Sequence, residues 1–488
     1  RREKIFGLNS VYFGFFWGST TKRPCLWEAS WIRRYHAEIS ISLCGINIPI
    51  NSTTTHSHTT FAIIHQSSQQ LTDIIMAHKD SSADDLESLH TFCKLLPKIE
   101  LHAHLNGSIR EHTLVELAAE RSVTLPAKFL LHEAEHHEPD KEAFFFNTKP
   151  RSLAECFDIF AVIPQCVNDL TALRRITREV LEDAANDHIA YLEIRTGPKV
   201  MMRDHRSKEA EYSTKKEYVE TIISIMEEFE KADKQRYEQD LVDKTIHGKA
   251  RLSMIPRLII SVDRSGTLDQ ALENVELAIE MSRSNWKKYI VGVELGGNPT
   301  RNDFRLFKPA FELARKEGLS ISIHCGEVPM GMNESEKDQN LLRAYQEAVA
   351  ILQFRPDRLG HALLLSDSLM ETLFENPIPI ECCPTSNTMT LDLALHHEGS
   401  LVEGMKMHPQ LGKWLARAYP ISINTDDSGL FNTNLTKEVL LVAGVHALGI
   451  SEVSKVILNS VDHIFDVRET KSRLRTSIHD AIEQLTVA

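Results

Sequence analysis

Seven polar residues of the sequence have the types and spacing needed to hold a metal ion and exchange protons: His102, His104, His324, Glu327, His361, Asp426 and Asp427. His102 and His104 are two residues apart, so on an extended chain both imidazoles point to the same side. Three imidazoles and one carboxylate suit Zn²⁺ and leave room for a water, whereas calcium and magnesium sites consist mainly of oxygen atoms. We therefore predict one zinc ion per chain, bound by His102, His104, His324 and Asp426. Glu327, three residues beyond His324, is close enough to exchange protons with the group that the water attacks.

A second pattern competes for the metal. Residues 132–136 (HEAEH) fit H-E-x-x-H, which places two imidazoles one helical turn apart beside a glutamate that can activate a zinc-bound water. However, the surrounding residues are acidic, Pro139 stops the helix, and no apolar stripe is present that would bury it. We interpret this pattern as a solvated helix end, and a zinc protease is the alternative. His56 and His58 lie in the run NSTTTHSHTT, which we interpret as a product of composition.

Eight short apolar runs must position these side chains, and most are followed by a longer amphipathic pattern such as LTALRRITREVLEDAANDH. The runs are residues 98–102, 189–195, 256–263, 289–295, 319–324, 358–361, 378–383 and 420–426. Continuous apolar runs indicate parallel strands that are buried on both faces. Eight strand–helix units predict a (β/α)8 TIM barrel, in which catalytic residues lie at the C-terminal ends of the strands. An H-x-H pair alone would be better explained as two core histidines, but further histidines and aspartates at three other strand ends favour a metal site.

Composition limits the class of protein. A formal net charge of -13 and a pI near 6.0 argue against nucleic-acid binding, which needs a basic surface. No run approaches the eighteen or so apolar residues that span a bilayer. The eight cysteines form no C-x-x-C pair, which is typical of reduced thiols inside the cell and excludes the cytidine-deaminase type of zinc site. We expect a cytoplasmic monomer that acts on a small molecule, without a nucleic-acid or membrane partner.

The first 75 residues differ in character from the rest of the chain. They contain no methionine, whereas Met76 opens an ordinary hydrophilic stretch, MAHKDSSADDLESLH. We predict that residues 1–75 are a disordered or spurious extension and that residues 76–488 form a single barrel domain. A transit peptide is the rival interpretation, but Glu3, Glu28 and Glu38 are acidic where such peptides avoid acid. The charged segment 233–251 has no apolar periodicity, which predicts a surface loop.

The motifs PKIELHAHLNGS, HCGEVP, RLGHA, ECCPTSN and NTDDSG, in this order, resemble the adenosine deaminase superfamily, most closely its adenosine-deaminase-like branch of N6-methyl-AMP deaminases. The resemblance runs from about Leu95 to about residue 480. It implies a barrel of the metal-dependent hydrolase type in which zinc-bound hydroxide attacks C6 of a purine. Glu327 would protonate the ring, and His361 would orient the water and assist its deprotonation. The implied substrate contacts are His104, Asn106, Arg195, Thr196, Gly197, Pro198, Asp263, the backbone of Gly297, and Asp427 at N7.

Asn106 bears on the choice of substrate. Adenosine deaminases usually carry Asp here, near the 5′ position of the sugar. A carboxylate about 4 Å from one phosphate charge costs roughly 4 kcal/mol at an effective dielectric near 20, or on the order of 10³ in affinity. Asn removes this repulsion, although it also suits the turn before Gly107. The stretch RTGPK, residues 195–199, resembles that of family members that accept a nucleotide, and Lys199 and Arg264 are natural phosphate partners.

The resemblance therefore predicts conversion of N6-methyl-AMP to IMP and methylamine, with adenosine deamination as the alternative. A catalytically inactive nucleotide-binding barrel is a remote alternative, because no ligand or proton donor is missing. Three positions depart from the pattern of relatives. Glu294 and Gly296 stand where Asp and Ser are more usual, and Pro164 stands where a histidine near the substrate is expected.

Overall fold

The computed structural model describes residues 83–126, 151, 153–207, 209–243, 251–328, 337–397 and 399–487. All of them belong to one compact unit, Thr59–Ala488. The predicted extension, residues 1–75, and the HEAEH motif, residues 132–136, lie outside the described residues.

Eight parallel strands follow one another around a single sheet in sequence order. They are β1 (Lys98–His104), β2 (Ile189–Thr196), β3 (Ile255–Asp263), β4 (Ile290–Gly296), β5 (Ser320–Cys325), β6 (Arg358–His361), β7 (Ile380–Cys382) and β8 (Ile421–Ile423). The chain just after β8 joins β1: the N–H of Asp426 donates to the carbonyl of His102 (2.8 Å), and the N–H of His104 donates to the carbonyl of Asp426 (2.9 Å). The predicted (β/α)8 barrel is confirmed.

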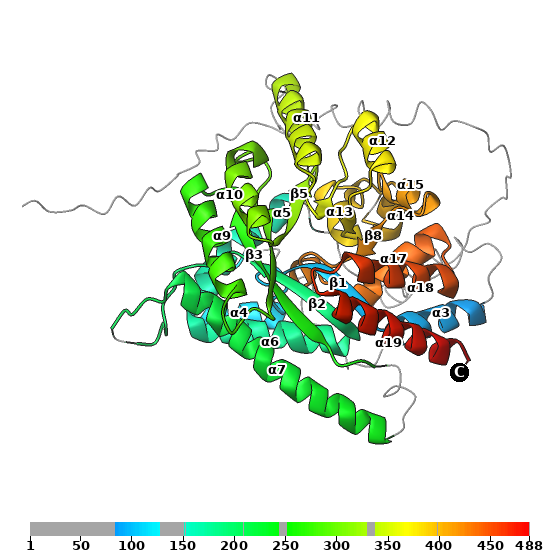
Figure 1. Cartoon of the computed structure of the whole chain (residues 1–488), viewed down its shortest axis with the longest axis horizontal. Coiled ribbons are helices and arrows are strands. Elements are labelled where there is room, and N and C mark those ends of the chain that lie inside the picture. The colour runs from blue at the N-terminus through cyan, green and yellow to red at the C-terminus, as the bar shows by residue number, and fades with distance from the viewer. Residues whose placement is uncertain are drawn as a thin grey trace, which may run out of the picture. The chain divides into compact units, whose positions relative to one another are not determined.

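Helices surround the strands (Figure 1). Those of the first half are α3 (Ala83–Leu95), α4 (Glu111–Glu120), α5 (Leu153–Cys166), α6 (Leu170–Asn186), α7 (Lys215–Asp243), α9 (Leu268–Ser282) and α10 (Phe304–Lys316). Those of the second half are α11 (Lys337–Phe354), α12 (Asp367–Glu375), α13 (Pro384–Thr390), η3 (Leu395–His397), α14 (Leu401–Lys406), α15 (Leu411–Ala416), α16 (Ser428–Phe431), α17 (Leu435–His446), α18 (Ile450–Ser460), η4 (Val461–His463) and α19 (Arg468–Val487). The first and last described helices, α3 and α19, pack side by side (Figure 1).

Predicted and observed strands agree in number and order. The sixth strand has the predicted bounds, and β1 extends two residues further than predicted, to His104. The last two are shorter than predicted at both ends: each begins late, and the chain then leaves the sheet early, into α13 after β7 and into the turn at Asp426 after β8. Each predicted ligand lies within the last three residues of a strand or just past its end, as the barrel interpretation requires.

The prediction of a surface loop over residues 233–251 is wrong for its first part. Helix α7 continues to Asp243, and Asp233 is buried within it. The Asp233 carboxylate forms an ion pair with Arg251 and accepts a hydrogen bond from the N–H of Met254 (2.8 Å), just before β3. Asp233 and Arg251 therefore form a buried ion pair that stabilises the start of β3.

The barrel interior is filled partly by charged side chains instead of the branched apolar residues usual in such barrels. Glu193 and Arg195 are two apart on β2, so both point to the same face of the strand. Arg358 lies 2.5 Å from Glu193 and 2.6 Å from Glu381, and its guanidinium stacks on the ring of Phe465 at 3.5 Å. These side chains are almost wholly buried, so each charge depends on its partners.

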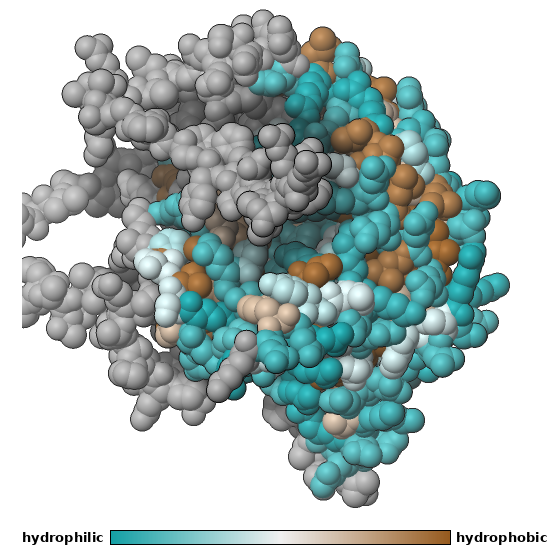
Figure 2. Space-filling model, turned by 90° about the vertical axis from the view of Figure 1, so that its left-hand side faces the viewer, coloured by the Kyte–Doolittle hydropathy of each residue, from teal (hydrophilic) through white to brown (hydrophobic). Residues whose placement is uncertain are grey.

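The surface in Figure 2 is mostly hydrophilic, with hydrophobic residues in separate patches. No helix among the described residues combines the length and the apolar character needed to cross a bilayer. The six cysteines of the described ranges are all free and buried.

We expect Glu193→Gln to lower the free energy of unfolding by about 3 kcal/mol, because it leaves the buried Arg358 with one carboxylate fewer. Chemical denaturation at constant pH measures this change. The control is Glu228→Gln, which breaks an exposed pair with Arg178 and should change stability little. Equal losses in the two variants would contradict a special role for the buried pair.

Candidate metal centre and active site

The four predicted metal ligands converge at the C-terminal ends of β1, β5 and β8. Nε2 of His104 lies 3.3 Å from Nε2 of His324, and Oδ1 of Asp426 lies 3.4 Å from Nε2 of both His102 and His104. Two ligand atoms on one zinc ion, each about 2.0–2.1 Å from the metal at near-tetrahedral angles, are about 3.3–3.4 Å apart. The spacing therefore fits a single zinc ion.

The protonation preferences of the cluster also favour a cation at its centre. Burial lowers the pKa of His104 to about 3 and that of His324 to about 4, so both rings are neutral and can act as ligands. Burial also disfavours a charge on His102, but hydrogen bonds to Asp426 and Glu381 outweigh it and raise its pKa to about 9. The histidine hydrogen bonds hold the pKa of Asp426 well below its usual range, although burial opposes this. The carboxylates thus attract positive charge to the point where a metal would bind.

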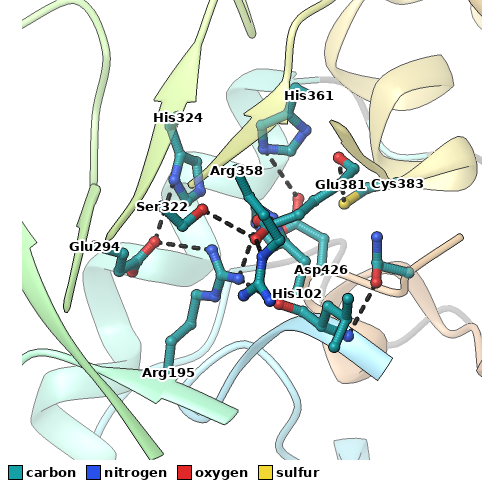
Figure 3. Close-up of polar contacts among 12 residues, drawn as sticks. His102, Arg195, Glu294, Ser322, His324, Arg358, His361, Glu381, Cys383 and Asp426 are labelled. Atoms are coloured by element: carbon teal, nitrogen blue, oxygen red, sulfur yellow. Dashed lines mark hydrogen bonds and ion pairs between the residues drawn. The ribbon is translucent and has the colours of Figure 1, made fainter. Parts of the chain in front are cut away.

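Two buried glutamates fix the orientation of the ligand rings (Figure 3). Oε2 of Glu381 on β7 lies 2.6 Å from Nδ1 of His102, and Oε2 of Glu294 on β4 lies 3.2 Å from Nδ1 of His324. Arg195 bridges these glutamates, at 2.9 Å from Glu294 and 3.0 Å from Glu381. Glu381 therefore accepts the Nδ1–H of His102, and Glu294 lies beside Nδ1 of His324 as an ion-pair partner; both leave Nε2 free for the metal, as carboxylate partners of metal-bound histidines do.

The unusual pair Glu294 and Gly296 has a steric explanation. A Cβ atom at position 296 would lie 3.0 Å from Oε1 and 3.4 Å from Cδ of Glu294, which is tighter than ordinary contact. A glycine at 296 therefore leaves room for the longer acid at 294, which reaches both Arg195 and His324. The two departures belong together.

Asp426 and His361 both have left-handed backbone conformations, with φ of 62° and 61°. Such values are uncommon outside glycine and are typical of functional positions that their surroundings hold in place. The Asp426 carboxylate accepts a hydrogen bond from Ser386 (2.7 Å), while its main chain pairs with β1. The residue at the end of β8 thus closes the barrel and presents a ligand at the same time.

Glu327, two residues after β5, and His361, the last residue of β6, face the ligand cluster. Nε2 of His361 lies 3.8 Å from Oε1 of Glu327 and 3.9 Å from Oδ2 of Asp426. His361 is fully buried, whereas the side chains of Glu327 and His104 remain 17% and 22% exposed, so the site opens on their side. The open side of the cluster therefore presents the candidate metal ligands, a carboxyl group and an imidazole together.

Asp427 is buried beside the cluster, and burial together with Asp426, Glu327 and Glu294 raises its pKa well above the usual range. It fits only because position 107 is glycine, since a Cβ there would lie 1.6 Å from Oδ1 of Asp427. The LNGS turn after β1 and the NTDD turn after β8 therefore interlock.

Asn106 lies in that LNGS turn, and its amide is 3.5 Å from the hydroxyl of Thr196 at the end of β2. Thr196 is in turn 2.7 Å from the hydroxyl of the buried Tyr218. On the neighbouring strands, a Cβ at Gly297 would lie 2.4 Å from Oδ1 of Asp263, and Gly297 has a φ of 84°. The structure thus brings Asn106 next to Thr196, and Gly297 next to Asp263.

Several residues predicted to contact the substrate have other surroundings in the structure. Arg195 is wholly buried beneath the ligands. Gly197 and Pro198 directly follow the end of β2. The prediction of Arg264 as a phosphate partner is wrong for this conformation: its buried guanidinium pairs with Glu347 and donates to the carbonyl of His324 (2.7 Å). Lys199 is exposed, so it remains a candidate. Pro164 lies exposed within α5.

Sequence reasoning assigned no role to Glu381, Arg358, Ser386, Asn387 or His408, all of which are buried around the site. Glu381, Ser386 and Asn387 lie in the motif ECCPTSN, so the motif pointed to them without showing what they contact. Nothing in the sequence pointed to His408. A separate cavity of about 520 Å³, lined by parts of α6 and α17 among others, includes none of the ligands.

The parallel barrel and the histidine-rich cluster at its strand ends define a barrel of the metal-dependent hydrolase type. Residues 97–481 match the profile of the adenosine deaminase family. The chain belongs to this family and is a deaminase of that type, which confirms the resemblance of its motifs.

Three known proteins illustrate the relationship. The chain is 33% identical to the N6-mAMP deaminase of Arabidopsis thaliana over 386 residues, which cover 78% of this chain and 95% of that protein. The crystal structure of Arabidopsis ADAL complexed with IMP is 31% identical with a TM-score of 0.59, and the match covers 80% of this chain and 99% of that one. A Burkholderia ambifaria amidohydrolase with bound Zn is 22% identical, with a TM-score of 0.60 over 83% of this chain and 95% of that one, and shares the fold.

We expect His324→Ala to lower the zinc content of the purified chain from about one ion to near zero, because one of three imidazole ligands is lost. Elemental analysis measures the content, and circular dichroism checks folding. The double variant His132→Ala, His136→Ala should keep its zinc. Loss of zinc from that double variant would instead support the protease-like motif.

Glu381→Gln should weaken zinc binding about 10–100-fold, because an amide orients and polarises His102 less well than a carboxylate. Chelator competition measures the affinity. The matched control is Glu193→Gln, which removes another partner of Arg358 but contacts no ligand, and should destabilise the chain without this loss of affinity. Equal affinities in both variants would refute the orienting role.

Proposed function

We propose that this chain is a zinc-dependent deaminase, with one Zn²⁺ per chain, that converts N6-methyl-AMP to IMP and methylamine. The observation that carries the proposal is that Glu327 and His361 face the same point as the three histidines and Asp426. A metal, an acid and an imidazole around one opening are the groups that hydrolytic removal of an amine from a purine requires.

Each side chain would have a separate task. A zinc ion at the four ligands would lower the pKa of its water from about 15.7 to about 7 and so supply the nucleophile. Glu327 would deliver a proton to the purine ring nitrogen as C6 becomes tetrahedral, which is worth roughly 10²–10⁴-fold. Asp427 would contact N7, and the backbone of Gly297 the far edge of the ring. The substrate would lie above His104 and Glu327, the two partly exposed members of the cluster.

The choice of a nucleotide rests on two supports. The Arabidopsis relative is named an N6-mAMP deaminase, and a related crystal structure contains IMP. In this chain, Asn106 adjoins Thr196 at the end of β2, so a neutral amide and a hydroxyl stand where an acid would repel a phosphate. Thr196, Gly197 and Pro198 would line the same side, with Lys199 as the cation nearest to them in sequence.

A comparison of N6-methyl-AMP, AMP and adenosine as substrates tests this proposal directly. We expect the Met76-to-Ala488 chain to convert N6-methyl-AMP to IMP much faster than it deaminates the other two. Glu327→Gln serves as the blank, because it keeps the size of the side chain and removes the acid. Preferential turnover of adenosine would refute the nucleotide assignment and leave a nucleoside deaminase.

Asn106→Asp is the sharper test of phosphate selection. The added carboxylate should lower kcat/KM for N6-methyl-AMP by about 10³-fold, which corresponds to roughly 4 kcal/mol of repulsion at an effective dielectric near 20. Rising salt should reduce the effect, because exposed charges are screened. Activity toward adenosine, which has no phosphate, is the internal control. An equal loss for both substrates would show that Asn106 acts on the turn instead of the phosphate.

A further inference from the structure

Three buried side chains form a hydrogen-bonded row behind the active site. As placed, Oδ1 of Asn387 on α13 lies 3.0 Å from Nδ1 of His361, and Nδ2 of the same amide lies 3.0 Å from Nε2 of His408. His361 and Asn387 are fully buried, and His408 is 8% exposed. The oxygen and the NH₂ group of an amide can be exchanged by turning the side chain over. Which of them faces each histidine must therefore be decided from a neighbour whose donors are known.

The fixed end is His408, just before α15. The main-chain N–H groups of Leu411 and Gln410 both point at its Nδ1, at 2.9 and 3.3 Å. A main-chain N–H can only donate, so Nδ1 of His408 must be the unprotonated acceptor. Burial, with the nearby His446 and His361, lowers the pKa of His408 to about 3, so the ring is neutral. Its single proton is therefore on Nε2, the atom that faces Asn387.

The amide of Asn387 must then turn its oxygen toward His408. With the reverse orientation, the amide N–H would face the Nε2–H of His408, donor against donor, in a place without solvent. The turned amide also suits Cys382, whose sulfur lies 3.9 Å from the position of Nδ2 of Asn387. Burial raises the pKa of the Cys382 thiol, so it stays protonated and can donate to an oxygen at that position. The NH₂ group of Asn387 consequently points at His361 and donates to its Nδ1.

We propose that His408, acting through Asn387, holds His361 in the tautomer that carries its proton on Nε2. This inference rests on the proposed function, because it concerns how His361 serves that reaction. Nε2 of His361 has no hydrogen-bond partner within the described part of the chain and faces the space between Glu327 and Asp426. His361 therefore donates a hydrogen bond to the attacking oxygen and does not take its proton. That proton passes to Glu327, which faces the same space and can then deliver it to the purine ring nitrogen. His408 and Asn387 are positioning residues.

The tautomer can be read without any substrate. In ¹⁵N-histidine-labelled protein, the imidazole nitrogen shifts distinguish protonated from unprotonated positions, and spectra of His361→Gln and His408→Gln assign the two rings. We expect both rings to carry their proton on Nε2, in the metal-free and the zinc-loaded chain. A proton on Nδ1 of His361 would overturn the proposal, even in a chain that proves active. An inactive chain with the expected tautomer would contradict the proposed function alone.

Substitutions at Asn387 and His408 separate the two roles of His361 in kinetics. Asn387→Asp offers only acceptors, which forces the proton of His361 onto Nδ1. Under the proposal kcat falls about 10²–10³-fold, the effect of losing one donor to the reacting oxygen, with KM little changed. If His361 were the base, the new carboxylate would strengthen it, and kcat would be kept or raised. That result would overturn the proposal.

His408→Gln is the conservative partner of this test. Its amide can still donate to Asn387, so we expect kcat within a few-fold of the original chain. His408→Leu removes the donor and should lower kcat at least 10-fold with zinc content and KM retained. A loss of the same size in both His408 variants would mean that the position acts only through packing, contrary to the proposal.

Discussion

The balance of charge inside the barrel is the constraint on which the rest of the site depends. The buried carboxylates are those of Glu193, Glu294, Glu381 and Asp426. Arg195 contacts Glu294 and Glu381, and Arg358 contacts Glu193 and Glu381. Burial raises the pKa of Glu100 to about 8, so this neighbouring acid adds little charge at neutral pH. The four carboxylates outnumber the two guanidinium groups, and a protonated His102 or a divalent cation at the ligand cluster would offset the remaining negative charge. Buried ions without such compensation would be costly to fold around.

Arg195 connects this balance to the geometry of the metal site. It holds Glu381, which orients His102, and Glu294, which orients His324. A single side chain on β2 therefore sets the direction of two rings on β1 and β5. Arg264 adds a third restraint, because it holds the carbonyl of His324 from the outer side. The ligands are thus fixed by contacts that cross the barrel, more than by the strands that carry them.

The sequence was sufficient for the parts of this arrangement that depend on residue type and order. Apolar runs located all eight strands, and the histidines and aspartates at four strand ends located the ligand cluster. It was insufficient where a residue type is ambiguous. Glu193, Arg195 and Arg358 are charged side chains within apolar strands, and only the closed barrel shows that they pair across its interior. Arg195 and Arg264 were taken for substrate partners for the same reason: a guanidinium suits a buried carboxylate as well as it suits a phosphate.

The double role of Asp426 limits how the metal site can change. Its main chain completes the ring of strands in a left-handed conformation, which glycine, asparagine and aspartate adopt most readily. Among these three, aspartate alone brings a negatively charged ligand. A laboratory selection for a different metal preference would therefore tolerate few substitutions at position 426. A bulkier ligand there would strain the backbone where the chain after β8 pairs with β1. Variation should concentrate on the histidines, which lie within β1 and β5 and do not need a left-handed backbone conformation.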